Sequence, residues 1–473
     1  MDLGNGVKAV NLWPVTTNGH TSPGCAVDYR AYGDYPVGAM HMEIRKSVLE
    51  LSKFDDVSAA TVRPSHMATR RLTPTVADYL GGDARLARVR RALPHRSKKC
   101  SRSPCVFFQS LKEAVCLRQT AEIWGTANVQ KREQMMRAAG QWSGFTAPGD
   151  NHGTVMEGKH TLYLALRHSQ YPLDVVIEED AVAGELGRYP VVFLADTHIS
   201  RAAAASLEQY VLNGGTLFVT ASGGLLDEYN ATNTAMEALL GIKQTGTFEG
   251  TRGINNTIWL AKQNIPFAPP LDTVSLNSTS EELTVIGLKS HFAVDPKAAA
   301  SGTTTVHAQF SDGKPAVVRR QVGSGSVIYA GFLPALSYFA HAYPRRPVDR
   351  MSADDSMTHF VPSNFSVAAR DELLVRLSGL HKEPRPVTCS EPLVEAAFIT
   401  ANHTGAAIVL SNWAGAAVDQ LSVTLHAHVP FKTATLATGG GVHVRRPASG
   451  AEGHATFAFA EPFEVADAII LRP

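Results

Sequence analysis

The stretch YPVVFLADTHISRAAAASLEQYVLNGGTLFVTASGGLLDEYN, residues 189–230, decides the fold class. Two short apolar runs, VVFL and TLFVTA, flank a segment with helical composition, RAAAASLEQYVLN. Ser200 stands where an N-cap side chain is preferred, and one of the glycines Gly214 and Gly215 suits the left-handed position that ends a helix. Short strands that are apolar throughout are typical of a parallel sheet covered on both faces. Strand, helix and strand with short connections therefore predict an open α/β sheet with a right-handed crossover.

The neighbouring segments extend this sheet, and the end of the chain then changes character. LYLALRH, residues 162–168, predicts a short buried helix, and PLDVVIEEDA, residues 172–181, predicts a strand with an acidic exit. In SDGKPAVVRR, residues 311–320, Asp312 and Gly313 predict the tight turn of a β-hairpin. The last stretch of roughly 80 residues alternates apolar and polar positions between frequent turns, which predicts a small all-β sandwich.

The composition is that of a globular protein with two or three domains. The chain has 473 residues, of which 44% are hydrophobic and 18% charged, and its formal net charge is +1. This balance favours neither a nucleic acid nor an anionic membrane as partner. Five cysteines without a CxxC pair predict no disulfide framework and favour a reducing compartment, hence the cytoplasm. No apolar run reaches the length of about 18 residues that a membrane span needs, and the N-terminus lacks the pattern of a signal peptide.

Two segments in the first part of the chain are unusual. VKAVNLWPV, residues 7–15, has the pattern of a buried strand that needs neighbours on both sides, so we expect the chain to be the C-terminal portion of something larger or the product of an incomplete gene model. RLARVRRALPHRSKKCSR, residues 85–102, holds eight Arg and Lys residues and no acid. Such a run can bind nucleic acid or direct targeting. It lacks the interleaved aromatic residues that base stacking prefers, so we favour a disordered or misannotated insert.

Four segments together carry a family resemblance. They are LYLALRHSQYPLDVVIEEDAV, YPVVFLADTHIS, LEQYVLNGGTLFVTASGGLLDEY and GSGSVIYAGFLPALSY. Their order resembles the trimerisation domain of family 42 β-galactosidases and their relatives. The resemblance implies an α/β open sheet of the flavodoxin-like, class I glutamine-amidotransferase-like type and a homotrimer. It also implies a catalytic TIM barrel before this domain and a small β domain after it.

The resemblance divides the chain into five parts. Residues 1–60 would be a remnant of the C-terminal end of a (β/α)8 barrel, and 61–105 the basic, disordered insert. Residues 106–341 would form the amidotransferase-like trimerisation domain. Residues 342–390 would be a polar linker, and 391–473 the C-terminal β-sandwich domain.

The sequence offers no candidate catalytic residue. In relatives of the family the two catalytic glutamates lie on earlier barrel strands, whereas Glu43 and Glu50 lie on a helix-like segment. A retaining glycosidase needs two carboxyl groups about 5–5.5 Å apart across the sugar, and no pair in residues 1–60 satisfies this requirement. An amidotransferase needs a cysteine on a strained turn after a strand. Cys116 has the pattern of a buried thiol, and Ser222 lacks the flanking glycines of a nucleophile elbow.

Weak candidates for a binding site remain. Asp196 and His198 lie where a strand ends and a helix begins, at the usual ligand crevice of open α/β sheets, and could bind a sugar hydroxyl; the alternative is turn and helix-capping chemistry. Asn11 and Trp13 end the first apolar run, where they could hydrogen-bond and stack on a sugar ring, or Trp13 could be core. The acids at 178–180 could join His198 around a metal, but adjacent acids at a strand exit are more often solvated.

Two classes of function follow. In the first, the chain is a glycoside-hydrolase-related, β-galactosidase-like protein that supplies oligomerisation and accessory domains and is not catalytic. In the second, it is a stand-alone amidotransferase-like or carbohydrate-binding module without a catalytic cysteine. Neither reading requires a cofactor or a metal. We expect a homo-oligomer, a trimer by resemblance, with a carbohydrate as the candidate ligand and neither nucleic acid nor membrane as partner.

Overall fold

The protein is described by a computed structural model. The described residues are 120–124, 152–245, 249–250, 270–278, 280–342, 365–401, 405–439, 441–445 and 454–473. The expectations for residues 1–60 and 61–105, and with them Asn11, Trp13 and Cys116, lie outside these ranges.

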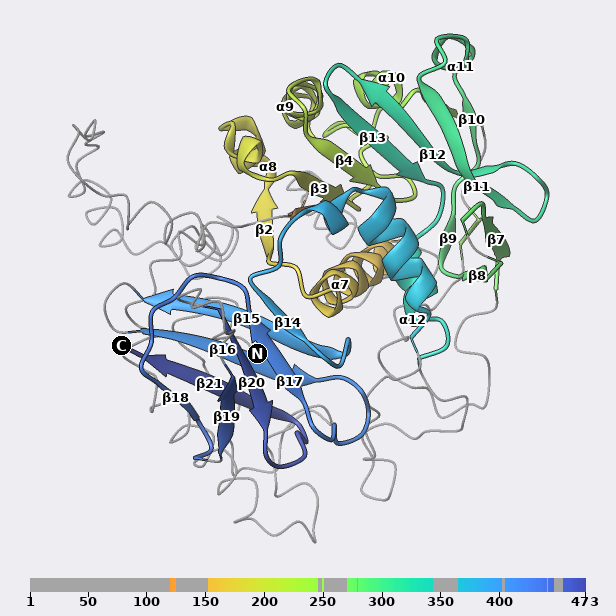
Figure 1. Ribbon diagram of the computed structural model, residues 1–473. Helices are drawn as coiled ribbons and strands as arrows, with labels where there is room; N and C mark the ends of the chain where they lie inside the picture. The colour runs from red at the N-terminus through yellow and green to blue at the C-terminus, as the bar shows by residue number, and fades with distance from the viewer. Residues whose placement is uncertain are drawn as a thin grey trace, which may run out of the picture.

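A nine-stranded mixed sheet forms the centre of the first half of the described chain (Figure 1). Its strand order is β2-β1-β3-β4-β13-β12-β11-β7-β8. In chain order the strands are β1 (Thr120–Trp124), β2 (Leu173–Ile177), β3 (Val191–Leu194), β4 (Thr216–Val219), β7 (Asp272–Leu276), β8 (Glu282–Val285), β11 (Thr304–Phe310), β12 (Pro315–Val322) and β13 (Gly325–Ala330).

The sheet is parallel at one end and antiparallel at the other. The five neighbouring strands β2, β1, β3, β4 and β13 pair in parallel. In the pair of β3 and β4, Val191 lies opposite Thr216. The neighbouring strands β13, β12, β11, β7 and β8 pair antiparallel. The prediction of an α/β sheet with a strand–helix–strand unit is therefore confirmed, whereas the antiparallel half of the sheet was not predicted. The predicted hairpin is confirmed too, because the Phe310 amide donates to the Lys314 carbonyl across a turn in which Gly313 has a φ of 78°.

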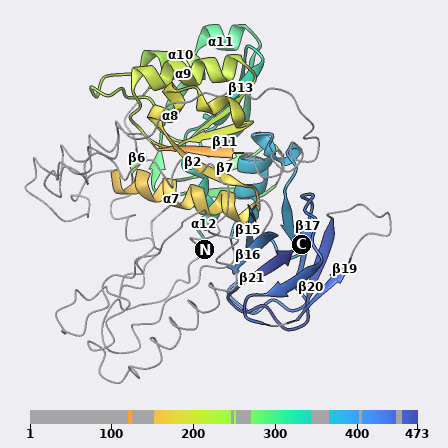
Figure 2. The ribbon, with the colours of Figure 1, turned by 90° about the vertical axis from the view of Figure 1, so that its left-hand side faces the viewer.

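Helices cover both faces of the sheet (Figures 1 and 2). One face packs on α7 (His152–His168), α12 (Pro334–Phe339) and the π-helix η5 (Ala369–Leu377). The other packs on α8 (Glu178–Val182), the short 3-10 helix η2 (Glu185–Arg188), α9 (Arg201–Leu212) and α10 (Thr234–Leu240). Alternate residues of each strand enter the two cores: Phe193 and Phe218 face α7, whereas Val192 and Leu217 face α9.

Helix α9 follows the local signals in its sequence. The Ser200 side chain accepts a hydrogen bond from the Ala203 amide at the N-cap. At the other end Gly214 has a φ of 108°, which a residue with a side chain rarely adopts. The helix therefore begins and ends where capping chemistry predicts.

Two small sheets and two short helices accompany the main sheet. The pair β5 (Ile242–Gln244) and β10 (Phe292–Val294) forms one two-stranded sheet, and β6 (Glu249–Gly250) and β9 (Leu288–Lys289) form another. Helix α11 (Pro296–Ala300) and the 3-10 helix η6 (Leu380–Lys382) complete this part. No helix among the described residues has the length and apolar character needed to cross a membrane.

The C-terminal part is a β-sandwich, as predicted. Two four-stranded antiparallel sheets, in the orders β14-β17-β20-β19 and β15-β16-β21-β18, enclose one apolar core that includes Phe457 and Ile469. The strands are β14 (Val387–Cys389), β15 (Val394–Ala401), β16 (Gly405–Asn412), β17 (Ser422–Leu425), β18 (Thr433–Leu436), β19 (Val442–Arg445), β20 (Ala455–Phe459) and β21 (Ala466–Arg472).

Part of the range expected to be a linker, 342–390, has a defined structure. Residues 365–382 contain η5 and η6, and the side chains of Phe365, Leu373 and Leu380 belong to the same apolar core as α7. This stretch therefore packs on the α/β domain and leads directly into the sandwich.

Candidate functional site

The candidate site lies at the carboxyl edge of the parallel strands. In the sheet, β1 lies between β2 and β3, and β4 lies on the other side of β3. After β1 the chain therefore moves in one direction to β2, and from β2 it returns past β1 to β3 and β4. This reversal makes a topological switch point, beside which open α/β sheets usually bind ligands. Asp196 and His198 follow β3 directly, so the sequence placed them at the correct edge.

Asp196 is buried in an ion pair. Its side chain is 0% exposed, and its Oδ2 atom lies 2.9 Å from Nζ of Lys159, which is 1% exposed. Lys159 comes from α7, which lies between β1 and β2 in the sequence. A buried charge is stable only when it is paired and hydrogen-bonded, and each of these residues provides that for the other. The carboxylate therefore ties α7 to the end of β3.

His198 is also held by protein groups. Its Nε2 atom lies 2.9 Å from Oδ1 of Asn230, and its Nδ1 atom lies 2.9 Å from Oγ1 of Thr197. Because the Asn230 oxygen only accepts, Nε2 donates the hydrogen bond to it. Asn230 has a left-handed backbone with a φ of 64°. The imidazole thus fixes the loop after β4 against the loop after β3.

Carboxylates of the chain itself occupy the N-terminal end of α9. Glu178 accepts from the Ser200 amide at 2.7 Å, and Glu228 accepts from the Arg201 amide at 2.9 Å. Free amides at a helix N-terminus attract anions, and here two side chains satisfy them. The expectation that the acids at 178–180 are solvated is wrong for Glu178 and Asp180, which are 4% and 5% exposed, and correct for Glu179, which is exposed. The Glu178 carboxylate is buried against the Ser200 amide, and the Asp180 carboxylate accepts from the Ile177 amide at the start of α8. Among the described residues no group of three or more side chains could hold a metal ion.

Asp227 shapes the loop that follows β4. Its Oδ1 atom accepts from the amides of Tyr229 and Ala231, and its Oδ2 atom lies 2.7 Å from Nη2 of Arg201. Desolvation alone would raise the pKa of this carboxyl, but the hydrogen bonds from Ala231 and Arg201 outweigh it and lower the pKa. These bonds fix the path of the loop, which places Tyr229, 75% exposed, under the Arg201 guanidinium.

The turn after β4 has strained backbone but no catalytic arrangement. Ser222 has a φ of 68°, in the left-handed region. The sequence pattern alone did not predict this backbone conformation. It is 2% exposed, and its Oγ atom has no hydrogen-bond partner in the described part of the chain. Its amide donates to the Tyr329 hydroxyl at 3.1 Å. A serine nucleophile needs a base within hydrogen-bond reach, and no described base is bonded to this hydroxyl.

A comparison with protein-family models gives a match over residues 141–345, to the family described as "Beta-galactosidase trimerisation domain". The matched range is 205 of the 473 residues, less than half of the chain. The match relates the chain to glycoside hydrolases, and the family resemblance seen in the sequence is confirmed. A search of the curated proteins found no significant match.

Several solved β-galactosidases are similar in structure to the chain. Gan42B, a GH42 β-galactosidase from G. stearothermophilus, has a TM-score of 0.47 and 13% identity over 75% of this chain and 40% of its own. The enzyme from Bacillus circulans sp. alkalophilus has a TM-score of 0.43 and 14% identity over 77% and 43% of the two chains. That from Rahnella sp. R3 has a TM-score of 0.44 and 14% identity over 75% and 41%. The chain thus spans less than half the length of these enzymes.

The range that matches the family model contains the whole candidate site. The matched range begins before α7 and ends after α12, so it covers Lys159, Asp196, His198 and the loop around Asp227. Sequence reasoning identified Asp196 and His198 but missed Lys159, which lies 37 positions from its partner. No local pattern marks this lysine, because the contact depends on α7 packing beside β3.

Proposed function

We propose that this chain supplies the oligomerisation and accessory domains of a β-galactosidase-like protein and does not itself catalyse glycoside hydrolysis. The observation that carries the proposal is the trimerisation-domain match over residues 141–345. The β-sandwich at 391–473 would be the accessory domain, the segment 1–60 a remnant of a TIM barrel, and the assembled protein a homotrimer.

The strand order supports a flavodoxin-like, amidotransferase-like classification of the α/β domain. Numbered along the chain, the five parallel strands β1, β2, β3, β4 and β13 follow the order 2-1-3-4-5. That order is typical of flavodoxin-like folds. The antiparallel strands β12, β11, β7 and β8 extend it at one edge.

The chemistry of the described nucleophiles supports a non-catalytic role. Ser222 is buried without a bonded base. Cys389 is the described free cysteine, and burial raises the pKa of its thiol to about 12, so the reactive thiolate does not form near neutral pH. Asp196 and His198 are engaged with Lys159 and Asn230. A carbohydrate at that crevice would have to displace these contacts, which makes the stand-alone binding module the second candidate.

Sedimentation velocity of the purified chain tests the proposal. We expect a species of three times the 50.8 kDa chain mass at micromolar concentration. A hydrolysis assay with a chromogenic β-galactoside should give no turnover above the buffer rate. A monomer at all concentrations would refute self-association. Turnover that co-purifies with the chain and saturates with substrate would refute the non-catalytic role.

A further inference from the structure

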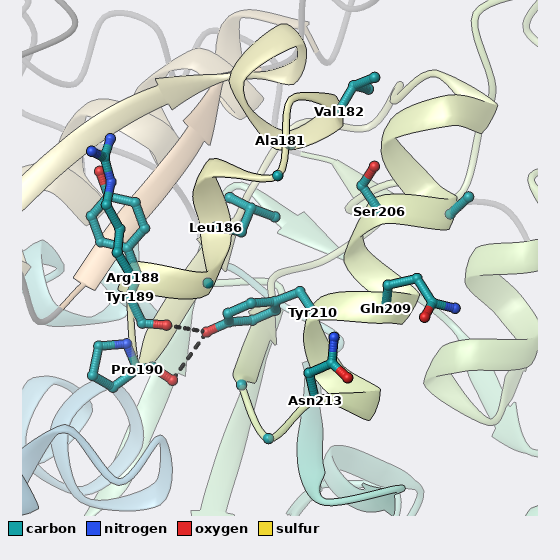
Figure 3. A pocket seen from close by; sticks show the side chains of 15 residues that line it. Ala181, Val182, Leu186, Arg188, Tyr189, Pro190, Ser206, Gln209, Tyr210 and Asn213 are labelled. Carbon is teal, nitrogen blue, oxygen red and sulfur yellow. Dashed lines mark hydrogen bonds between the residues drawn. The ribbon is translucent and has the colours of Figure 1, made fainter. Parts of the chain in front are cut away.

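A pocket lies on the opposite side of the α/β domain from Asp196. It has a volume of about 610 Å³ and lies between the crossover α8–η2 and the second half of α9 (Figure 3). Pro190 and Gly215, which precede β3 and β4, form its base. The pocket is therefore at the amino edge of these strands. Its volume falls within the range of roughly 300–1,000 Å³ that is usual for small-molecule sites.

The wall of the pocket is preformed. The Tyr210 hydroxyl lies 2.8 Å from the Tyr189 carbonyl oxygen and 3.0 Å from that of Pro190, as Figure 3 shows. Burial raises the pKa of this phenol far above its usual range, so it stays neutral. Val182, 51% exposed, is the large apolar side chain of the lining that is open to a ligand, whereas Tyr210, 7% exposed, forms a fixed wall. Leu186 and Tyr189 are buried beside it.

Two carboxamides supply the open polar groups. Gln209 and Asn213 line the pocket one helical turn apart, and both are exposed. Neither side chain makes a hydrogen bond to a described residue, so each offers a donor and an acceptor to a ligand. Figure 3 shows both side chains on the α9 side of the pocket.

The charges of the lining favour a neutral ligand. Among the described lining residues Arg188 is the charged one, and Glu185 lies 3.4 Å from its guanidinium. A cation would find no carboxylate in the lining, and an anion would compete with Glu185. A wholly apolar ligand would leave Gln209 and Asn213 without partners, which costs free energy.

We propose that this pocket binds a neutral mono- or disaccharide. A sugar ring has an apolar face that suits the exposed side chains of Val182 and Ala205, and its hydroxyls both donate and accept, which suits Gln209 and Asn213. A single chain contains every group that the proposal uses, so sugar binding and self-association can fail independently of each other.

The test is a titration of the full chain with lactose, followed by saturation-transfer NMR, with glucuronate and triglycine as an anionic and a peptide probe. Ala205→Trp should fill the pocket, because Ala205 is exposed and lines it. Ala202→Trp is the matched control, since Ala202 is exposed on the same helix outside the lining. We expect the lactose Kd to rise about tenfold or more with Ala205→Trp and to stay within about twofold with the control.

A second pair of variants tests the carboxamides without adding bulk. Combined Gln209→Ala and Asn213→Ala should weaken lactose binding about tenfold, whereas Glu208→Ala, at an exposed position of the same helix, should not change it. Absence of saturable lactose binding up to about 20 mM in the parent chain would overturn the proposal. So would tighter binding of glucuronate or triglycine. If Ala205→Trp lowers the sedimenting mass and leaves lactose binding unchanged, the pocket is a contact between copies and the proposal is wrong.

Discussion

His168 is a titratable side chain that the fold has removed from water. It ends helix α7 and is 1% exposed. Its ring lies 5.1 Å from that of Phe365 and 5.2 Å from that of Trp413, between centroids. Its Nδ1 atom lies 2.9 Å from the Tyr338 hydroxyl. An imidazolium in this apolar setting would lose its hydration without gaining an equivalent partner.

The pKa of His168 predicts a loss of stability in mild acid. Burial lowers this pKa from 6.5 to about 4, and the charges of Arg370 and Arg167 act in the same direction, whereas Glu395 opposes them. Between these pH values the unfolded chain binds a proton that the folded chain does not. The free energy of unfolding should therefore be unaffected above pH 6.5 and fall as the pH decreases toward 4, by about 3 kcal/mol in total.

Urea unfolding of the parent chain and of His168→Gln at pH 7 and pH 5 measures this effect. Glutamine does not titrate, so the variant should lose about 2 kcal/mol less than the parent chain over this interval. The comparison cancels the contributions of His307 and His426, whose pKa values burial also lowers. An equal decrease in both proteins would contradict the assignment to His168.

Single residues were predictable where their partners are local. Ser200 caps α9 through the Ala203 amide three positions away, and sequence alone identified it. Asp196 was recognised as polar and well placed, but its partner Lys159 lies 37 positions away and depends on helix packing. Ser222 shows the same limit, because its left-handed φ follows from how the turn fits against Tyr329.

At the scale of elements, the join between α9 and β4 depends on a close approach. A Cβ atom at Gly215 would lie 2.2 Å from Cζ of Tyr210. The ring cannot move aside without giving up the hydrogen bonds of its hydroxyl to the backbone. Glycine at this position therefore lets the helix pack against the start of the strand.

Gly215→Ala should destabilise the protein, because the new methyl group overlaps the Tyr210 ring. We expect a loss of about 1–3 kcal/mol in the free energy of unfolding, as for other overpacked sites. Gly187→Ala is a control on the opposite wall of the pocket, where a Cβ would meet nothing within 4 Å. Urea denaturation compares the two variants. Equal stability would show that α9 shifts to accommodate the methyl group.

Helices and strands were predicted best where the pattern of apolar residues and the capping or turn residues indicate the same boundaries. The unit β3-α9-β4 formed as expected, and so did the hairpin of β11 and β12. The burial of Glu178 after β2 was not predicted, because its partner, the Ser200 amide, lies 22 positions away. The antiparallel extension of the sheet through β7 and β8 was not predicted either, since pairing between distant strands leaves no local pattern.

At the scale of the whole molecule, the end of α7 joins the α/β domain to the β-sandwich. Nε of Arg167 lies 2.8 Å from Oε1 of Glu395 on β15, with both side chains at most 4% exposed. Burial raises the pKa of Glu395, but the charge of Arg167 outweighs it and the pKa is lowered. The Gln170 side chain also accepts from the Cys389 amide and donates to the Val394 carbonyl. The two domains should therefore unfold as one cooperative unit.

Hydrogen exchange tests this coupling. In the parent chain the amides of β3 and β16 should exchange with the same opening free energy. Arg167→Met leaves Glu395 buried without its partner, so we expect a loss of about 3–5 kcal/mol that speeds exchange in β16 more than in β3. The double variant Arg167→Met with Glu395→Leu removes both charges and should recover most of the loss. If the single variant accelerates β3 and β16 equally, the ion pair stabilises the whole fold without joining its halves. If it accelerates neither, the sandwich is held by the apolar contacts of Phe365 and Trp413 around His168, which Arg167→Met leaves in place.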